Sequence, residues 1–307
     1  MITKKAFFSF TFISNSLFAY QIEEKKIHLH FDINKTIIAM DAVQGKGIEE
    51  TVNGVLAEFT FEKWDGQIEQ SFYAYTTAQI EQEYPLLSRT SGIFKKLRAE
   101  RLANFPEHLK QYPELLVQYE KDKASMLQIL STEKIVIFPS FFKTIEWLNQ
   151  NFPNRYAIYL RTFGKDLSEI IQTLADKKIL TFKSQGKFKE RTLDIADPNK
   201  PLSEFFKNPD LNHYALCDDY TYWESKDFQA IGGKPFFIDI NDSQNVSIFF
   251  DDNANDLDKP IICPLGFSSD LEDTQELMKK GNIVAVNPKE AILNENYFID
   301  KIKFVLT

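Results

Sequence analysis

Cysteine is scarce in this sequence, which has only Cys217 and Cys263 among its 307 residues. They form no CxxC pair and suggest no disulfide framework, so we interpret both as small buried apolar side chains. A basic excess is also missing, because the net charge is −8 and no basic block occurs. This balance argues against recruitment of nucleic acid or of an anionic membrane surface.

Internal repeats and low-complexity tracts are absent as well. Hydrophobic residues make up 43% of the chain, which excludes a disordered protein. A chain of 307 residues can bury one large core and add a smaller module, but it is too short for three ordinary domains. Phenylalanine is abundant, with 28 residues, and we interpret it as packing material rather than as chemistry.

The N-terminus resembles a secretory signal peptide over residues 1–20. Lys4 and Lys5 precede an apolar run over residues 6–19, and a charged segment follows at 21–26. We therefore expect cleavage after Ala19 and export to the periplasm or the medium. Leu17 and the polar residues within the run weaken this pattern, so a cytoplasmic protein with a peripheral N-terminal helix stays the alternative. The run is too short for a stable membrane span.

Apolar runs with strand and helix periods alternate along most of the chain. Residues 26–31 alternate apolar side chains with His28 and His30, which indicates a strand. Further strands are expected over 156–160, 235–240, 246–250 and 283–286, with extended pieces at 135–138 and 180–183. Helices are expected over 141–149, with Ser140 as N-cap, and over 165–174 and 296–305, with one helical turn near 202–206. The pattern predicts an α/β fold: a Rossmann-like parallel sheet with helices on both faces.

Residues 42–130 have a different texture. Helical periodicity covers 48–58, 94–104 and 107–130, and β-like pieces at 58–60 and 71–74 flank the turn Trp64-Asp65-Gly66. Because strand–helix alternation is absent, we interpret this segment as an inserted, mainly helical module. The core of the α/β fold would then comprise residues 21–41 and 131–307.

Three predicted strands end in chemically useful residues. Asp32 follows the first strand, Thr162 the second, and Asp251-Asp252 a later one. Parallel strands bring their carboxyl ends to one edge, where α/β proteins bind ligands. Carboxylates so close repel one another unless a cation lies among them, and oxygen donors suit Mg²⁺. Helix N-termini beyond the strands can bind a phosphate, and a carboxylate can attack its phosphorus.

These residues also resemble the motifs of a known family, the haloacid dehalogenase-like superfamily. The resemblance covers roughly residues 26–41 and 135–290, and its motifs occur in the family's order. In sequence the four motifs are Phe31-Asp32-Ile33-Asn34-Lys35-Thr36, Tyr159-Leu160-Arg161-Thr162, Gly232-Gly233-Lys234-Pro235, and Phe249-Phe250-Asp251-Asp252-Asn253 with Asp256.

The resemblance implies a Mg²⁺-dependent phosphohydrolase that acts on a phosphorylated small molecule through an aspartyl-phosphate, with residues 42–130 as its cap. Lys187, Lys189 and Lys226 are alternatives for the lysine of the third motif. The implied roles are Asp32 as nucleophile and metal ligand, Asn34 as a ligand through its backbone carbonyl, Thr162 on a phosphoryl oxygen, Lys234 for charge neutralisation, Asp251 on Mg²⁺, and Asp252 or Asp256 in support.

One position departs from the family pattern. Most phosphatases of this family carry an acid two residues after the nucleophile, but here that residue is Asn34, which cannot donate a proton as an acid does. His30 is a candidate replacement, although a core histidine is the more ordinary interpretation. Asn34 therefore leaves two hypotheses open: a phosphohydrolase, or a catalytically weak binding or effector protein that retains the pocket and the metal.

Overall fold

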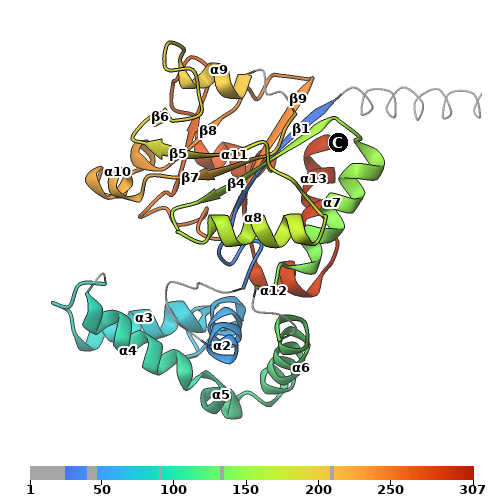
Figure 1. Cartoon of the computed structure of the whole chain (residues 1–307). Helices are drawn as coiled ribbons and strands as arrows, with labels where there is room; N and C mark the ends of the chain where they lie inside the picture. The colour runs from blue at the N-terminus through green and yellow to red at the C-terminus, as the bar shows by residue number, and fades with distance from the viewer. Residues whose placement is uncertain (1–24, 40–46, 90, 132–134, 208–210) are drawn as a thin grey trace, which may run out of the picture. The chain divides into compact units, whose positions relative to one another are not determined.

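The structure is a computed structural model that describes residues 25–39, 47–89, 91–131, 135–207 and 211–307 (Figure 1). The chain forms two compact units. The first comprises the described parts of residues 1–33, 142–286 and 296–307, and the second comprises the described parts of residues 34–141 and 287–295. The predicted signal peptide at residues 1–20 lies outside the described residues.

A seven-stranded sheet forms the centre of the first unit, with the strand order β11-β9-β1-β4-β7-β5-β6. All neighbouring strands are parallel except β5 and β6. The strands are β1 (Lys26–Asp32), β4 (Tyr156–Thr162), β5 (Ser184–Lys189), β6 (Thr192–Leu193), β7 (Tyr214–Cys217), β9 (Asn245–Asp251) and β11 (Ile283–Ala285). The predicted α/β class with a mostly parallel sheet is confirmed.

The two faces of the sheet are covered differently, as the alternation of side chains along β1 shows. Phe31 faces helix α13 (Tyr297–Leu306), where its ring contacts Phe298 at a centroid distance of 5.2 Å. His30 faces the opposite side and contacts Phe236 at 5.3 Å. Phe236 belongs to β8 (Lys234–Phe237), which pairs with β10 (Ile262–Leu265) in a separate two-stranded sheet. A small second sheet therefore covers part of the face where helices were expected.

Helices complete the first unit around these sheets. Their amphipathic sequences bury one side, as in α8, where Leu167, Ile170 and Leu174 are buried at helical spacing. The helices are α7 (Pro139–Asn151, mostly in this unit), α8 (Leu167–Asp176), α9 (Leu202–Lys207), α10 (Tyr220–Ser225) and α11 (Thr274–Lys280), besides α13 and the short 3₁₀ turn η2 (Ala230–Gly232).

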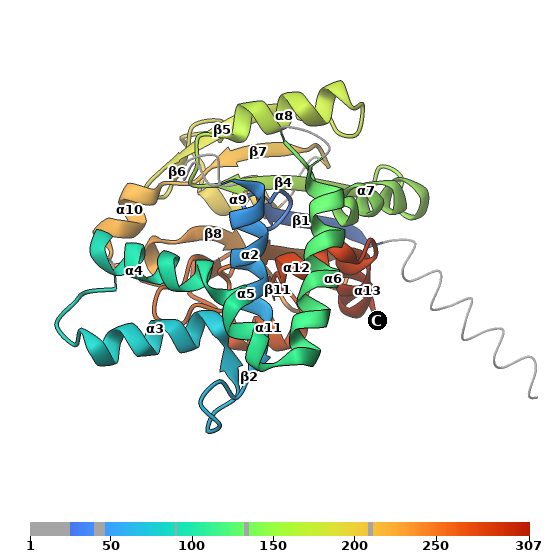
Figure 2. The same cartoon turned by 90° about the horizontal axis from the view of Figure 1, so that it is seen from below.

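The second unit is mainly helical (Figure 2). Helix α2 contacts α3, α4 and α6, and α12 contacts α2 and α6. Its helices are α2 (Ile48–Phe59), α3 (Phe72–Glu83), α4 (Gly92–Ala103), α5 (Phe105–His108), the 3₁₀ turn η1 (Leu109–Gln111), α6 (Pro113–Leu130) and α12 (Pro288–Leu293). Strands β2 (Phe61–Glu62) and β3 (Gln70–Ser71) form a short hairpin beside them. Trp64 lies in this hairpin, and its ring contacts Phe72 and Phe105.

Local sequence patterns misled several of the element predictions, including the β-like piece at 58–60, where residues 58 and 59 end α2. In the β-like piece at 71–74 only Ser71 belongs to a strand; its hydroxyl accepts the Ala74 N–H and caps α3, which begins at Phe72. Ser140 lies inside α7 rather than at its N-cap, and its hydroxyl donates to the Ala291 carbonyl at 2.5 Å. The extended pieces at 135–138 and 180–183 are not strands, and in the first of them Ile137 makes only an isolated bridge.

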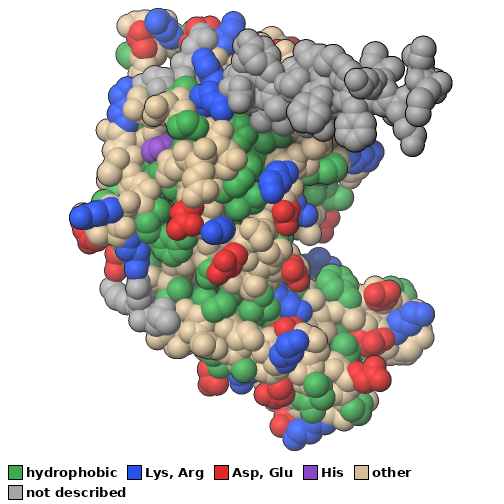
Figure 3. All heavy atoms as spheres, turned by 90° about the vertical axis from the view of Figure 1, so that its right-hand side faces the viewer, with side chains coloured by type: hydrophobic (Ala, Val, Ile, Leu, Met, Phe, Trp, Pro, Cys, Tyr) green, Lys and Arg blue, Asp and Glu red, His purple; other side chains and the backbone are tan. Residues whose placement is uncertain are grey.

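Among the described residues, no helix has the length and apolar character needed to cross a membrane. On the face shown in Figure 3, lysine and arginine side chains are interspersed with aspartate and glutamate side chains. This mixture agrees with the modest negative net charge of the sequence, −8.

Candidate functional site

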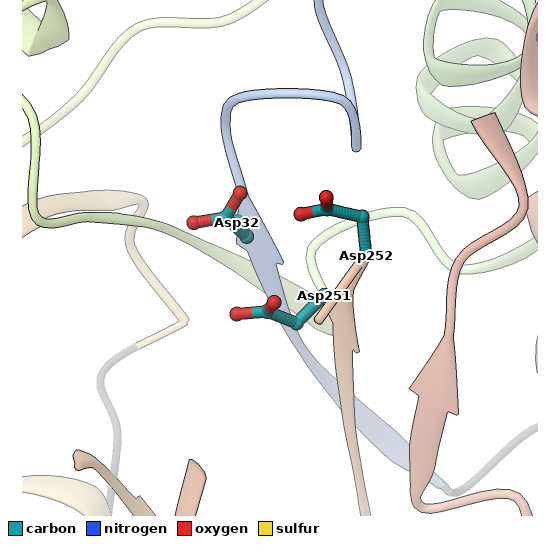
Figure 4. Close-up of side chains that lie close together, drawn as sticks. All are labelled: Asp32, Asp251 and Asp252. Atoms are coloured by element: carbon teal, nitrogen blue, oxygen red, sulfur yellow. The ribbon is translucent and has the colours of Figure 1, made fainter. Parts of the chain in front are cut away.

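The carboxyl ends of β1 and β9 bring three aspartates together (Figure 4). Asp32 is the last residue of β1, Asp251 is the last residue of β9, and Asp252 follows it. The parallel register pairs Phe31 with Phe250, so the two strands end side by side. One carboxylate oxygen from each aspartate lies within 4.8 Å of the others. Strand register therefore produces the carboxylate cluster that the separate sequence positions only suggested.

Lys234, the first residue of β8, bridges two of these aspartates. Its ammonium nitrogen lies 2.5 Å from Asp32 Oδ1 and 2.7 Å from Asp251 Oδ2, and its side chain is only 1% exposed. The alternative lysines Lys187, Lys189 and Lys226 are exposed. Among the four lysines considered from the sequence, Lys234 is the one that contacts the aspartate cluster.

Burial and charge together determine the protonation of this cluster. Burial raises the pKa of the Asp32 carboxyl to about 7, with the Lys234 ammonium opposing the shift and Asp251 adding to it. Burial also acts to lower the pKa of Lys234, but the carboxylates of Asp251, Asp32 and Asp218 outweigh it and raise that pKa above its ordinary value. Lys234 is therefore a stable cation among a surplus of carboxylates.

Thr162 ends β4, the strand beside β1, where Asp32 pairs with Arg161. The Thr162 side chain is buried, and its hydroxyl oxygen accepts the Gly164 N–H at 2.8 Å. Helix α8 begins after Asp166, so Thr162 is not its N-cap. The hydroxyl hydrogen is available to a ligand at this sheet edge, because the bond to Gly164 uses only an acceptor lone pair.

Two residues predicted for the site are not among the three clustered carboxylates. Asn34 follows β1 in a turn, bridges Ile38 and belongs to the second unit. Its side-chain oxygen Oδ1 is buried and has no hydrogen-bond partner among the described residues. Asp256 is exposed, and its Oδ1 accepts the backbone N–H groups of Asp258 and Lys259. Its carboxylate therefore caps a turn.

His30 is a core residue in this structure. It is 2% exposed, and its ring stacks on Tyr159 at 4.5 Å and on Phe249 at 5.4 Å. Its Nδ1 lies 3.2 Å from the Arg161 guanidinium, which has only N–H donors, so Nδ1 acts as the acceptor. Burial and this positive charge hold the pKa of His30 well below its ordinary value. His30 is therefore a neutral acceptor and a poor replacement for the missing acid.

Sequence reasoning missed the pairing of Arg161 with Asp218. The guanidinium makes two hydrogen bonds to the carboxylate, at 3.1 and 2.5 Å, and both side chains are almost completely buried. Arg161 also donates to the Pro235 carbonyl at 2.8 Å, and the Asp218 N–H donates to the Thr162 carbonyl at 2.7 Å. The pair thus ties the end of β4 to the residue after Lys234. An arginine inside an apolar strand was the available indication, since a buried charge needs a partner.

The donor set suits a divalent cation. The cluster has three carboxylates and one ammonium, which contacts Asp32 and Asp251, so it keeps a negative surplus; Asp32 and Asp251 are buried and Asp252 is half-buried. Hard oxygen donors are what Mg²⁺ prefers, and oxygens within 4.8 Å of one another can converge on one ion through small side-chain shifts.

Comparisons of the chain with protein-family models, with curated proteins and with solved structures find no match.

Proposed function

We propose that this protein is a Mg²⁺-dependent phosphohydrolase of the haloacid dehalogenase-like type, with a phosphorylated small molecule as substrate. The observation that supports this most is the buried cluster of Asp32, Asp251 and Lys234 at the ends of neighbouring strands. A lysine that contacts both carboxylates lowers the repulsion an incoming phosphoryl group would meet. The four motifs in family order support the same conclusion.

Asp32, Asp251 and Asp252 would hold the Mg²⁺, and the backbone carbonyl of Asn34 is a further candidate ligand. When bound, the ion would offset charge on the phosphoryl oxygens and favour the ionised form of Asp32. The second unit, which contains residues 42–130, would act as the cap that selects the substrate.

Asp32 acts as the nucleophile in this proposal. One of its carboxylate oxygens attacks phosphorus, and the bond from phosphorus to the leaving oxygen breaks with its electron pair on that oxygen. Thr162 donates its hydroxyl hydrogen to a phosphoryl oxygen, and the Lys234 ammonium stabilises the charge that develops beside Asp32. The leaving oxygen takes a proton from solvent water. A second water then attacks phosphorus and gives up a proton to solvent, the bond to Asp32 breaks, and phosphate leaves. The net reaction consumes one ester and one water and yields phosphate and the alcohol.

A second candidate function is a binding or effector protein with slow turnover, and the observation that favours it is Asn34. General acid–base catalysis contributes roughly 10²–10⁴ in rate, so its loss would leave a pocket that binds better than it reacts.

A phosphate-release screen with Mg²⁺ over acyl, aryl and alkyl phosphates distinguishes the hydrolase from the binding protein. The hydrolase predicts release that Asp32→Asn removes and that the exposed control Asp300→Asn retains. Release no faster than without protein, together with Mg²⁺-dependent binding of phosphate, would instead favour the binding protein.

A further inference from the structure

Aromatic side chains extend from the aspartate cluster along the same edge of the sheet. Phe163 directly follows Thr162, and the Lys234 ammonium lies 5.2 Å from the centroid of its ring. Phe163 also stacks on the buried Trp223 at a centroid distance of 5.4 Å. The next ring is Tyr220, 5.7 Å from Phe163 and 45% exposed. Contacts of 2.5, 5.2 and 5.7 Å therefore lead from Asp32 through Lys234 and Phe163 to an exposed aromatic ring.

Local hydrogen bonds explain why Tyr220 lies there. Cys217, the last residue of β7, pairs with Thr162, so the chain beyond β7 emerges at the edge that holds the site. Tyr220 is the first residue of α10, and the N-cap Asp219 accepts the N–H groups of Tyr222 and Glu190. The ring also contacts Trp223 at 6.1 Å and Phe228 at 6.2 Å. A ring supported by three others offers a stacking surface that is already ordered before a ligand arrives.

The leaving group supplies an independent argument. Asn34 stands where the family carries its acid, and the His30 ring is buried in the core, packed against Tyr159 and Phe249 with Nδ1 beside the Arg161 guanidinium. Neither can protonate a leaving oxygen. A substrate that reacts well without that proton has a leaving group that departs as a stable anion, and an oxygen attached to an aromatic ring does so far more readily than an alkyl oxygen.

We propose that the substrate is an aryl phosphate, a phosphate monoester whose oxygen is attached to a planar aromatic ring, and that Tyr220 binds this ring while the phosphoryl group lies at Asp32. This inference rests on the proposed phosphohydrolase function. In the reaction the bond from Asp32 to phosphorus forms, and the bond from phosphorus to the aryl oxygen breaks. The aryl oxide leaves with the electron pair and takes a proton from solvent water.

Four substrates separate the ring from the leaving group. Phenyl phosphate has the ring and a good leaving group, acetyl phosphate has only the leaving group, adenosine 5′-monophosphate has only a planar ring, and glycerol 3-phosphate has neither. With Mg²⁺ present, we expect kcat/KM to be highest for phenyl phosphate and lowest for glycerol phosphate. If adenosine monophosphate has a higher kcat/KM than phenyl phosphate, the aryl assignment is wrong and a nucleotide substrate is indicated.

Variants of Tyr220 test the stacking surface. In Tyr220→Ala, the ratio of kcat/KM for phenyl phosphate to that for acetyl phosphate should fall roughly tenfold, mainly through KM, while Tyr220→Phe should keep the ratio. Phe304→Ala is the matched control, because Phe304 is 62% exposed and lies in α13, outside the second unit. An unchanged ratio in Tyr220→Ala, or an equal loss for both substrates, would overturn the role of Tyr220.

Binding measured by calorimetry keeps the two proposals distinguishable. Phenylphosphonate and methylphosphonate have a carbon–phosphorus bond in place of the ester bond. They are therefore not hydrolysed and report binding alone. Tighter binding of phenylphosphonate, lost in Tyr220→Ala, supports the ring site even if no phosphate ester is turned over, and the hydrolase proposal alone would then fail. Equal binding of both phosphonates would overturn the ring site, whatever the turnover.

Discussion

Two buried ionic clusters lie close together in the first unit, and their charges are balanced differently. Arg161 and Asp218 form a one-to-one pair with two hydrogen bonds, completed by the Pro235 carbonyl. In the other cluster one ammonium, that of Lys234, contacts Asp32 and Asp251, and Asp252 adds a third carboxylate. The first cluster is satisfied by the protein itself, whereas the second keeps a surplus of negative charge.

This difference in charge balance distinguishes a structural ion pair, Arg161 with Asp218, from a candidate reactive site, the aspartate cluster around Lys234. A buried pair with matched charges and satisfied hydrogen bonds has nothing left to bind, and its loss is felt mainly in stability. Unbalanced buried carboxylates are costly to keep and are typical of sites that take up a cation or a ligand. Changing one cluster should therefore affect function, and changing the other should affect folding.

The largest expected effect is the loss of phosphate release in Asp32→Asn. An amide is far too poor a nucleophile to attack phosphorus, so turnover should fall on the order of 10⁴-fold or more. The melting temperature should stay close to that of the wild type, because the change removes a repelling charge and conserves the shape of the side chain. Phosphate release within a few-fold of wild type would remove Asp32 from the proposed mechanism.

Changes to the pair of Arg161 and Asp218 should instead lower the stability of the protein. Arg161→Met leaves Asp218 buried without its partner, and we expect a loss of about 3–5 kcal/mol in the free energy of unfolding, measured with urea. The double variant Arg161→Met with Asp218→Leu should recover much of that loss, since it removes both charges. If the single variant is as stable as wild type, the contrast between the two clusters is wrong.

Mg²⁺ should stabilise the protein through the unbalanced cluster. At a concentration 100 times its dissociation constant, a ligand that binds only the folded state stabilises it by about 2.7 kcal/mol. A beryllium fluoride mimic of the phosphoryl group should add to the shift. Thermal melting with and without Mg²⁺ measures the effect, which Asp251→Asn should diminish and the control Asp300→Asn should preserve. A melting curve unaffected by saturating Mg²⁺ and fluoride would count against a phosphoryl site.

The variant Asn34→Asp tests whether the aspartate cluster lacks a general acid. Restoring the acid should raise turnover of alkyl phosphates by roughly tenfold or more, because their leaving oxygens need a proton, and should change aryl and acyl phosphates much less. The new charge near Asp32 would reduce part of this gain. The measurement is kcat for glycerol phosphate and for phenyl phosphate. An equal slowing of both would show that Asn34 has a role of its own.

The smallest expected effect concerns stability in acid. Burial lowers the pKa of all four histidines, and for His28 and His213 it falls to about 4. Between pH 6.5 and 4 the histidines of the unfolded chain therefore bind more protons than those of the folded protein. The free energy of unfolding decreases as the pH is lowered through this range, by about 1.4 kcal/mol per pH unit for each net proton. Asp32 opposes this, because its raised pKa makes the folded protein bind a proton between pH 7 and 4.

Urea unfolding at pH 7 and pH 5 measures this balance. The variant Asp32→Asn lacks the opposing group and should lose stability more steeply than wild type on acidification. A shallower loss in that variant would mean that Asp32 is ionised in the folded protein at pH 5.

Local patterns determined much of the fold and of the site in advance. β1 was predicted within one residue because its apolar alternation is a local signal, and α2 (Ile48–Phe59) follows the same logic at helical period. Helix α3 was missed because its aromatic and β-branched residues suit a strand equally well, and the Ser71 cap decided for the helix. Asp32, Thr162 and Asp251 could be named because parallel strands end at a common edge.

What the sequence determined by itself is which residues end the strands and carry chemistry. Only the tertiary structure decided which of them meet: Lys234 rather than three other lysines, Asp218 with Arg161, and His30 in the core. The physical reason is that strand and helix periods depend on neighbouring residues, whereas a buried ion pair joins positions such as 32 and 234, whose contact depends on strand order and register.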